Sequence, residues 1–319
     1  MTELVCLGEI LIDFTPVRVN EDIYYEKNPG GAPANVAVAF SKLGGKSSFI
    51  GMVGNDDFGR FLKAILEKNK LDTRGLCFTD KANTTLAFVS LTESGERSFT
   101  FYRKPGADML LSKRDLNLQI IKETKIFHFG SLSMTNKTSE EAALKALNFA
   151  RKNKKIVSFD PNLRAALWND LNVARRKIKS VINRVDILKI SEDELYFITS
   201  ENDIKKGLDL IEKTYRTPII LLTMGEKGAL YSFNGKRKSF KSYKTNAIDT
   251  TGAGDAFLGG FLFLILKEKF FENYLPETID RAVSFANATA AITVSRRGAI
   301  PAMPEYYEVI RLMEACKPS

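Results

Sequence analysis

Residues 248–261 read IDTTGAGDAFLGGF, a glycine-rich turn that leads directly into an apolar helical stretch. Free N–H groups at the start of such a helix point towards one position and favour an anion there. Asp255 adds a carboxylate beside that position. This combination suits phosphoryl transfer, in which a carboxylate accepts the proton of an attacking hydroxyl. A turn in which Asp255 only complements the helix dipole is the alternative interpretation.

Short apolar runs alternate with amphipathic helical patterns along most of the chain. Six runs predict strands: LVCLG (4–8), SFIGMVG (48–54), KIFHFG (125–130), KIVSFD (155–160), VDILKI (185–190) and PIILLT (218–223). Several lack an apolar–polar alternation, as is typical of parallel strands covered on both faces. Strands that alternate with helices predict a parallel, doubly wound α/β sheet.

Two helix starts show capping patterns. Asn55 precedes the apolar positions of a helix over 58–66 and is expected to be its N-cap. Thr138 and Glu141 have the spacing of a capping box ahead of the next helical pattern.

Residues 14–29 and 84–104 interrupt the alternation. The second segment reads as a hairpin around Glu93–Glu96, because two alternating runs flank a turn that contains glycine. Neither segment has the crossover helix that a strand of the parallel sheet requires. Both are therefore expected to form a small antiparallel sheet, inserted into a single domain that spans residues 1–319.

Composition excludes several classes of protein. The 319 residues carry 47 basic and 38 acidic side chains, one histidine (His128) and three cysteines without ligand spacing. Multi-histidine metal sites, zinc sites and a disulfide framework are therefore not indicated. The net charge of +9 lacks an accompanying nucleic-acid motif, and no apolar run is long enough to span a bilayer. We expect a cytoplasmic protein with reduced thiols.

A second glycine cluster, NPGGAPANVAVAFSKLGG, occupies residues 28–45. Gly30 and Gly31 allow another molecule to approach the backbone closely. The Asn35 amide offers a donor and an acceptor, as a polyol requires, and the Asp13 carboxylate can accept two sugar hydroxyls. A simple hinge into a buried helix is the alternative for the two glycines.

Together these clusters resemble the ribokinase-like (PfkB) family of sugar kinases. GGAPANVAVAFSKLG is similar to the family's N-terminal signature and DTTGAGDAFLGGF to its C-terminal signature. Further segments resemble those of fructokinases in the same order: FYRKPGADMLL (101–111), IFHFGSLS (126–133), FDPNLRAALW (159–168) and ILKISEDEL (187–195). The resemblance covers essentially the whole chain. It implies a three-layer α/β/α sandwich with a mostly parallel central sheet and a small antiparallel β lid.

The resemblance also implies roles for individual residues. Asp255 matches the catalytic base, and Gly252, Ala253 and Gly254 match the anion hole. The expected sugar-binding residues are Asp13, Gly30, Gly31, Asn35, Arg103 and Arg164, the last at the sugar or a phosphate. The expected ATP-binding residues are Thr223, Gly225 and Gly228 of LLTMGEKGALY, and Asn287 of FANATAAI.

The metal-associated segment departs from the family pattern. Where ribokinases have NxxE, this chain has Ser191-Glu192-Asp193-Glu194. Glu194 is retained, so Mg²⁺ dependence is expected, with Glu194 in the outer coordination shell. Ser191 and Glu194 also fit a capping box, which leaves an ordinary helix start as the alternative. A monovalent cation such as K⁺, near Asp249 and the loop 295–298, is implied by the resemblance alone.

The expected reaction is transfer of the γ-phosphate of ATP to the 6-hydroxyl of D-fructose. A 2-keto-3-deoxygluconate kinase is the alternative substrate assignment, with Arg103 or Arg164 as the partner of the acid group. An inactive sugar or nucleotide sensor is the alternative from a different class, although such a protein need not retain Asp255.

The predicted small sheet suits a lid that keeps water from the reacting phosphate. Leu86 and Phe88 alternate with Ala87 and Val89, so both faces of its hairpin are apolar. An apolar second face predicts a homodimer through the lid, with Tyr102 or Arg103 reaching the sugar pocket. Coverage of that face by helices of the same chain is the alternative.

Overall fold

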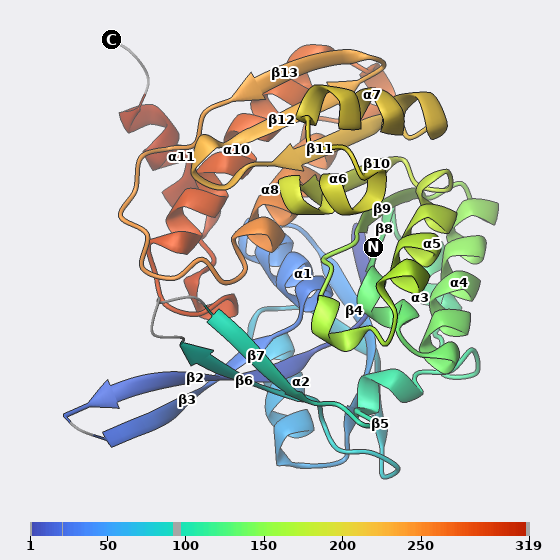
Figure 1. Ribbon diagram of the computed structural model, residues 1–319, viewed down its shortest axis with the longest axis vertical. Helices are drawn as coiled ribbons and strands as arrows, with labels where there is room; N and C mark the ends of the chain where they lie inside the picture. The colour runs from blue at the N-terminus through green and yellow to red at the C-terminus, as the bar shows by residue number, and fades with distance from the viewer. Residues whose placement is uncertain (1, 21, 92–96, 317–319) are drawn as a thin grey trace.

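A nine-stranded sheet forms the centre of the computed structural model, which describes residues 2–20, 22–91 and 97–316 (Figure 1). The strand order is β13-β12-β11-β10-β9-β8-β1-β4-β5, parallel from β11 to β5 and antiparallel at β12 and β13. The six predicted strands are confirmed as β1 (Leu4–Leu7), β4 (Ser47–Gly54), β8 (Ile126–Gly130), β9 (Ile156–Asp160), β10 (Ile187–Ser191) and β11 (Ile219–Thr223).

Three strands of the sheet were not predicted. They are β5 (Asp72–Thr79), β12 (Ala229–Phe233) and β13 (Lys236–Phe240). β5 and β13 are the two edge strands, where one side of the backbone remains unpaired and polar residues are tolerated. The sequence KRKSF of β13 accordingly lacks the apolar run by which the central strands were recognised.

Helices cover both faces of this sheet, so the expected three layers are confirmed. One apolar core lies beneath α1 (Ala32–Lys42), α2 (Asp57–Lys68), α8 (Ala253–Lys267), α10 (Pro276–Val294) and α11 (Tyr306–Ala315). The other lies beneath α3 (Leu118–Glu123), α4 (Lys137–Lys152), α5 (Leu171–Ile182), α6 (Glu192–Thr199) and α7 (Ile204–Thr214). None of the helices in the described part of the chain combines the length and apolar character needed to cross a bilayer.

The two predicted helix caps are wrong in their residues. The N-cap of α2 is Asp56, whose carboxylate accepts a bond from the Gly59 N–H at 2.7 Å. The N-cap of α4 is Asn136, one turn before the proposed box, and Glu141 pairs instead with Lys113. Asx residues compete for such positions, and only the backbone geometry decides which one caps the helix.

The smaller sheet has the strand order β3-β2-β6-β7. β2 (Leu11–Val19) and β3 (Asp22–Gly30) form one antiparallel hairpin, and β6 (Leu86–Leu91) and β7 (Arg97–Tyr102) form the other. The two hairpins are joined by parallel pairing of β2 with β6, which the expectation of a purely antiparallel sheet did not include. The predicted turn Glu93–Glu96 lies outside the described residues. In Figure 1 the sheet projects from one end of the molecule, with α2 beside it.

The two faces of this sheet have different surroundings. Asp13, Ala87 and Phe101 share one face through their register, and Ala87 is fully buried. On the opposite face the Phe88 ring lies 4.8 Å from Phe14 and 5.4 Å from Tyr102, and Phe14 reaches α2. The sheet therefore has one face towards the domain and an aromatic face that is only partly covered.

Candidate active site

The turn at the start of α8 places Asp255 in the first turn of the helix. Gly252 has φ +76°, a left-handed conformation in which a side chain would also collide with Ala299. The Asp249 carboxylate braces the turn by accepting bonds from the N–H groups of Thr251 (2.8 Å) and Gly298 (3.1 Å). Ala253 donates to the Thr250 carbonyl at 3.3 Å, so the amides of this turn face the space in front of the helix with only weak internal bonding.

The Asp255 carboxylate is buried and held by two amides. Asn35 of α1 donates to Oδ2 at 2.8 Å, and Asn162, beyond β9, donates to Oδ1 at 3.2 Å. Burial, reinforced by the nearby Asp160 charge, raises the pKa of Asp255 to about 6, while Asn35 and Lys189 oppose the increase. A carboxylate with a pKa in this range is suited to accept a proton near neutral pH.

Two cavities meet at Asp255. The smaller, about 70 Å³, is lined by Glu9, Leu11, Asp13, Gly31, Ala32, Asn35, Phe101, Leu132, Asn162, Arg164, Thr251, Gly252 and Asp255. The larger, about 410 Å³, is lined by Asn162, Arg164, Lys189, Ser191, Glu194, Thr223 and the turn 250–255. The first contains carboxylates and amides that suit hydroxyl groups, and the second contains the helix N-terminus and cations that suit phosphates. Asp255 lies at the boundary between them.

The glycine pair before α1 brings the backbone against these carboxylates. A side chain at Gly30 would lie 2.1 Å from Asp13 Oδ2, and one at Gly31, at φ +109°, would lie 2.5 Å from the Glu9 carbonyl. Burial raises the pKa of Asp13 to about 7, and the neighbouring Arg164 charge lowers it in part. The predicted residues Asp13, Gly31 and Asn35 are therefore brought to one cavity.

Glu9 is a site residue that the sequence analysis missed. Its Oε1 accepts a bond from the Ala32 N–H at 3.0 Å, whereas its buried Oε2 has no partner among the described residues. Asn35 Oδ1 is in the same condition. Buried polar atoms require partners, so both oxygens are placed to accept hydroxyl groups of a ligand. The available signal was an acidic residue directly after an apolar strand.

A buried ion pair on the phosphate side was also missed. Lys189 Nζ of β10 lies 2.9 Å from the Asp160 carboxylate, and both side chains are almost fully buried. A lysine within the apolar run ILKI was the available signal. Glu194 lies close to this pair, and burial together with the Asp160 charge raises its pKa. Its two oxygens accept bonds from the N–H groups of Leu163 (2.8 Å) and Ser191 (2.9 Å), which confirms the capping box.

The structure corrects the part of the lid that reaches the sugar side. Phe101 lines the smaller cavity, whereas Tyr102 points to the opposite face and is 64% exposed. Arg103 does not line the cavity. Its guanidinium forms a buried ion pair with Asp108 at 2.6 Å and donates to Thr135 at 2.9 Å. Alternate side chains of a strand point to opposite faces, so the register selects Phe101 and excludes Tyr102.

The remaining predicted residues lie around the larger cavity or beyond it. Arg164 is exposed and lines both cavities, and Thr223 lines the larger one. Gly225 and Gly228 form the turn after β11 and do not line either cavity. Asn287 of α10 donates to the Lys241 carbonyl at 3.2 Å, which fixes the segment after β13. His128 is confirmed as a buried core residue, bonded to Ser158 at 3.1 Å.

A carboxylate base between a hydroxyl-binding cavity and an anion-binding helix start defines a phosphotransferase. Comparison with known proteins agrees with this class. The family model described as "pfkB family carbohydrate kinase" matches residues 1–306. The chain belongs to this family, as its two glycine signatures predicted.

Curated relatives include Fructokinase-1 of Oryza sativa subsp. japonica, 43% identical over 98% of both chains, and Fructokinase-1 of Zea mays, 42% identical over 98% of this chain and 97% of the other. Among solved structures, fructokinase with bound ATP from Xylella fastidiosa matches with a TM-score of 0.90 at 32% identity, covering 98% of each chain. Fructokinase from Vibrio cholerae, with fructose, ADP and calcium ion bound, matches with a TM-score of 0.90 at 35% identity, covering 98% of this chain and 99% of the other.

Proposed function

We propose that this protein is an ATP-dependent fructokinase that phosphorylates the 6-hydroxyl of D-fructose. The observation that carries the assignment is the set of three buried carboxylates, Glu9, Asp13 and Asp255, around the smaller cavity. Carboxylate oxygens accept hydroxyl groups and repel anions, so a neutral polyol fits there better than a sugar acid. The similarity to fructokinases over nearly the whole chain supports the same substrate.

In the proposed reaction the sugar hydroxyl lies in front of Asp255. As its oxygen attacks the γ-phosphorus, the hydroxyl proton passes to the Asp255 carboxylate, and the bond from the γ-phosphorus to the bridging oxygen of ADP breaks. Asn35 and Asn162 keep the carboxylate oriented. The amides of Gly252, Ala253 and Gly254, with Arg164 nearby, stabilise the negative charge on the transferring group. Thr223, Gly225, Gly228 and Asn287 are proposed to line the ATP site.

Mg²⁺ fits the chain only as an ion that ATP brings with it. The described residues contain no group of three or more acidic, histidine or cysteine side chains placed to hold a metal. Mg²⁺ characteristically keeps several waters and binds phosphates with few protein ligands, so Glu194 is proposed to act through water. Bound there, the ion would offset phosphate charge during transfer. A K⁺ ion is proposed near Asp249 and Gly298.

The smaller sheet is proposed to be a lid that also forms a homodimer contact. Its hairpin β2–β3 exposes large apolar side chains: Val19, Ile23, Tyr24 and Tyr25 are 47–57% exposed. Val89, in contrast, is only 5% exposed and is covered within the chain. The proposed contact therefore involves the β2–β3 hairpin and not Val89. A cytoplasmic location is also proposed, since Cys6, Cys77 and Cys316 are all free.

Steady-state kinetics on fructose and 2-keto-3-deoxygluconate, measured with the same preparation, tests the assignment. We expect kcat/KM to be at least about 100-fold higher for fructose, because the acid group would enter a cavity with three carboxylates. Fructose 6-phosphate should be the product, which phosphoglucose isomerase in a coupled assay detects and fructose 1-phosphate does not reproduce. A preference for the sugar acid would overturn the substrate, and no transfer to either sugar would favour a sensor.

A further inference from the structure

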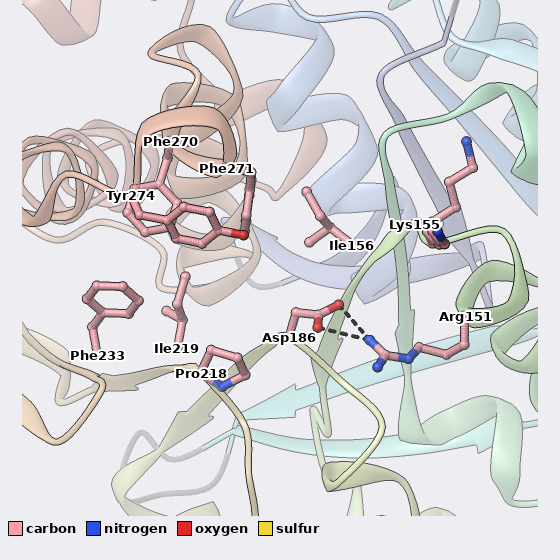
Figure 2. Close-up of a pocket in the computed structure, with 11 residues that line it drawn as sticks. Arg151, Lys155, Ile156, Asp186, Pro218, Ile219, Phe233, Phe270, Phe271 and Tyr274 are labelled. Carbon is pink, nitrogen blue, oxygen red and sulfur yellow. Dashed lines mark hydrogen bonds and ion pairs between the residues drawn. The ribbon is translucent and has the colours of Figure 1, made fainter.

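A cavity of about 320 Å³ lies at the end of the central sheet remote from Asp255 (Figure 2). Ile156 and Ile219 begin β9 and β11, and Asp186 directly precedes β10. Both active-site cavities lie instead beyond the carboxyl ends of these strands. The cavity shares no residue with them, and the volume is within the range of small-molecule sites.

Aromatic side chains form the floor of this cavity. Phe270 of α9 (Phe270–Asn273) has its ring centroid 5.5 Å from both Phe233 and Tyr274, and 5.2 Å from Phe271. Figure 2 shows these rings on one side and Arg151 with Asp186 on the other. Lys269 and Tyr274 bracket α9 in left-handed conformations, φ +55° and +52°, which are costly for residues other than glycine. The short helix is thus held in a fixed, unfavourable geometry that presents its rings.

Basic side chains form the rim. Arg151 pairs with both oxygens of Asp186, at 2.9 and 3.1 Å, so this pair contributes no net charge. Lys154 and Lys155 have no carboxylate within ion-pair distance in the described part of the chain. A second cavity of about 270 Å³ shares Lys154, Lys155, Ile156 and Phe271 with the first, and adds Lys125 and Lys269 to the basic rim and one acidic residue, Glu272. The combined surface is therefore both aromatic and strongly basic.

We propose that this cavity is a second ligand site, which takes a small organic anion that carries an aromatic ring. The ring would pack on Phe271 and Tyr274, and a phosphate or carboxylate group would pair with Lys154 and Lys155. A cation would be repelled by the rim, and a neutral apolar molecule would leave the ammonium groups without a partner. An inorganic anion would gain nothing from the aromatic floor.

Isothermal titration calorimetry with phenyl phosphate tests the site in protein saturated with fructose and ADP. We expect one equivalent to bind, and inorganic phosphate and benzyl alcohol to bind at least about ten-fold more weakly, because each lacks one of the two groups. Equal affinity for inorganic phosphate would overturn the proposal, as would the absence of any binding. The readout depends on none of the active-site residues, so it is independent of the proposed activity.

Variants locate the binding. Lys154→Glu with Lys155→Glu should weaken phenyl phosphate at least about ten-fold, since attraction becomes repulsion. Tyr274→Asn removes the ring while keeping a residue that tolerates the left-handed conformation, and it should weaken phenyl phosphate but not inorganic phosphate. Lys152→Glu, exposed on α4 and lining neither cavity, is the matched control. Unchanged affinity in the double variant, with melting temperatures like that of the wild type, would overturn the proposal.

Discussion

The side-chain amide of Asn35 donates a 2.8 Å hydrogen bond to the carboxylate of Asp255, although 220 positions separate the two residues along the chain. The bond joins the start of α1 to the start of α8, and so connects the two glycine-rich segments of the sequence. It leaves Asn35 Oδ1 buried and without a partner in the described chain. One side chain thus orients the proposed base and offers an acceptor to the sugar.

Asp255→Asn should lower kcat by at least about 100-fold while fructose affinity changes little, because no other carboxylate is placed between the two cavities. Steady-state kinetics, together with fructose binding by calorimetry, checks this. A variant that keeps a tenth or more of the wild-type kcat would show that Asp255 is not the general base.

The pH profile of kcat/KM should fall on the acid side with an apparent pKa between about 6 and 7. Burial raises the pKa of Asp255 to about 6 and that of Asp13 to about 7, and the base must be ionised to accept a proton. His128 cannot account for the limb, since burial and the Lys189 charge lower its pKa to about 3. His128→Asn should leave the limb in place if the variant folds. An acid limb near pH 4 would contradict the perturbed carboxylates.

Glu9→Gln should raise KM for fructose and change the pH dependence of stability. Burial raises the pKa of folded Glu9 from 4.5 to about 7. The folded protein then holds a proton that the unfolded chain loses between these values, so this contribution to stability declines as pH rises. Replacing Glu9 removes the loss, which amounts to up to roughly 3 kcal/mol. Melting curves at pH 5 and pH 8 should therefore show the variant gaining on the wild type, and Glu26→Gln on the exposed lid should not.

Glu194→Gln should raise the Mg²⁺ concentration needed for half-maximal rate. Because Glu194 also caps α6, loss of stability alone would not be informative. Ser191→Ala breaks the same capping box from the other side and serves as the matched control. Both variants should melt at lower temperature, and only Glu194→Gln should shift the Mg²⁺ titration. Identical titrations would leave Glu194 with a structural role only.

Sedimentation of the wild type at micromolar concentration should show a homodimer that Ile23→Lys disrupts. Ile23 is 57% exposed on the β2–β3 hairpin, where a charge would have to be desolvated in an interface. Leu210→Lys, at an apolar position of α7 that is 40% exposed, is the control and should remain dimeric. A monomeric wild type would remove the dimer, and a dimer insensitive to Ile23→Lys would move the interface elsewhere.

Local sequence carried much of the fold, because buried parallel strands and amphipathic helices have distinct periodicities. The six central strands and the helix that bears Asp255 were predicted in this way. The edge strands β5 and β13 were not, since an edge needs no continuous apolar run. Nor could local pattern choose Asp56 over Asn55 as the cap of α2, because both side chains are able to accept the bond.

The sequence by itself determined Asp255, the glycine turn before it and the glycine pair at Gly30 and Gly31, because these positions depend on residue type and close spacing. Only the tertiary structure decided which side chains join them. It brought Glu9 and Asn162 to the site, placed Phe101 there instead of Tyr102, and committed Arg103 to a buried pair with Asp108. Such choices depend on strand register and on desolvation of charges between distant segments, which no local pattern of residues encodes.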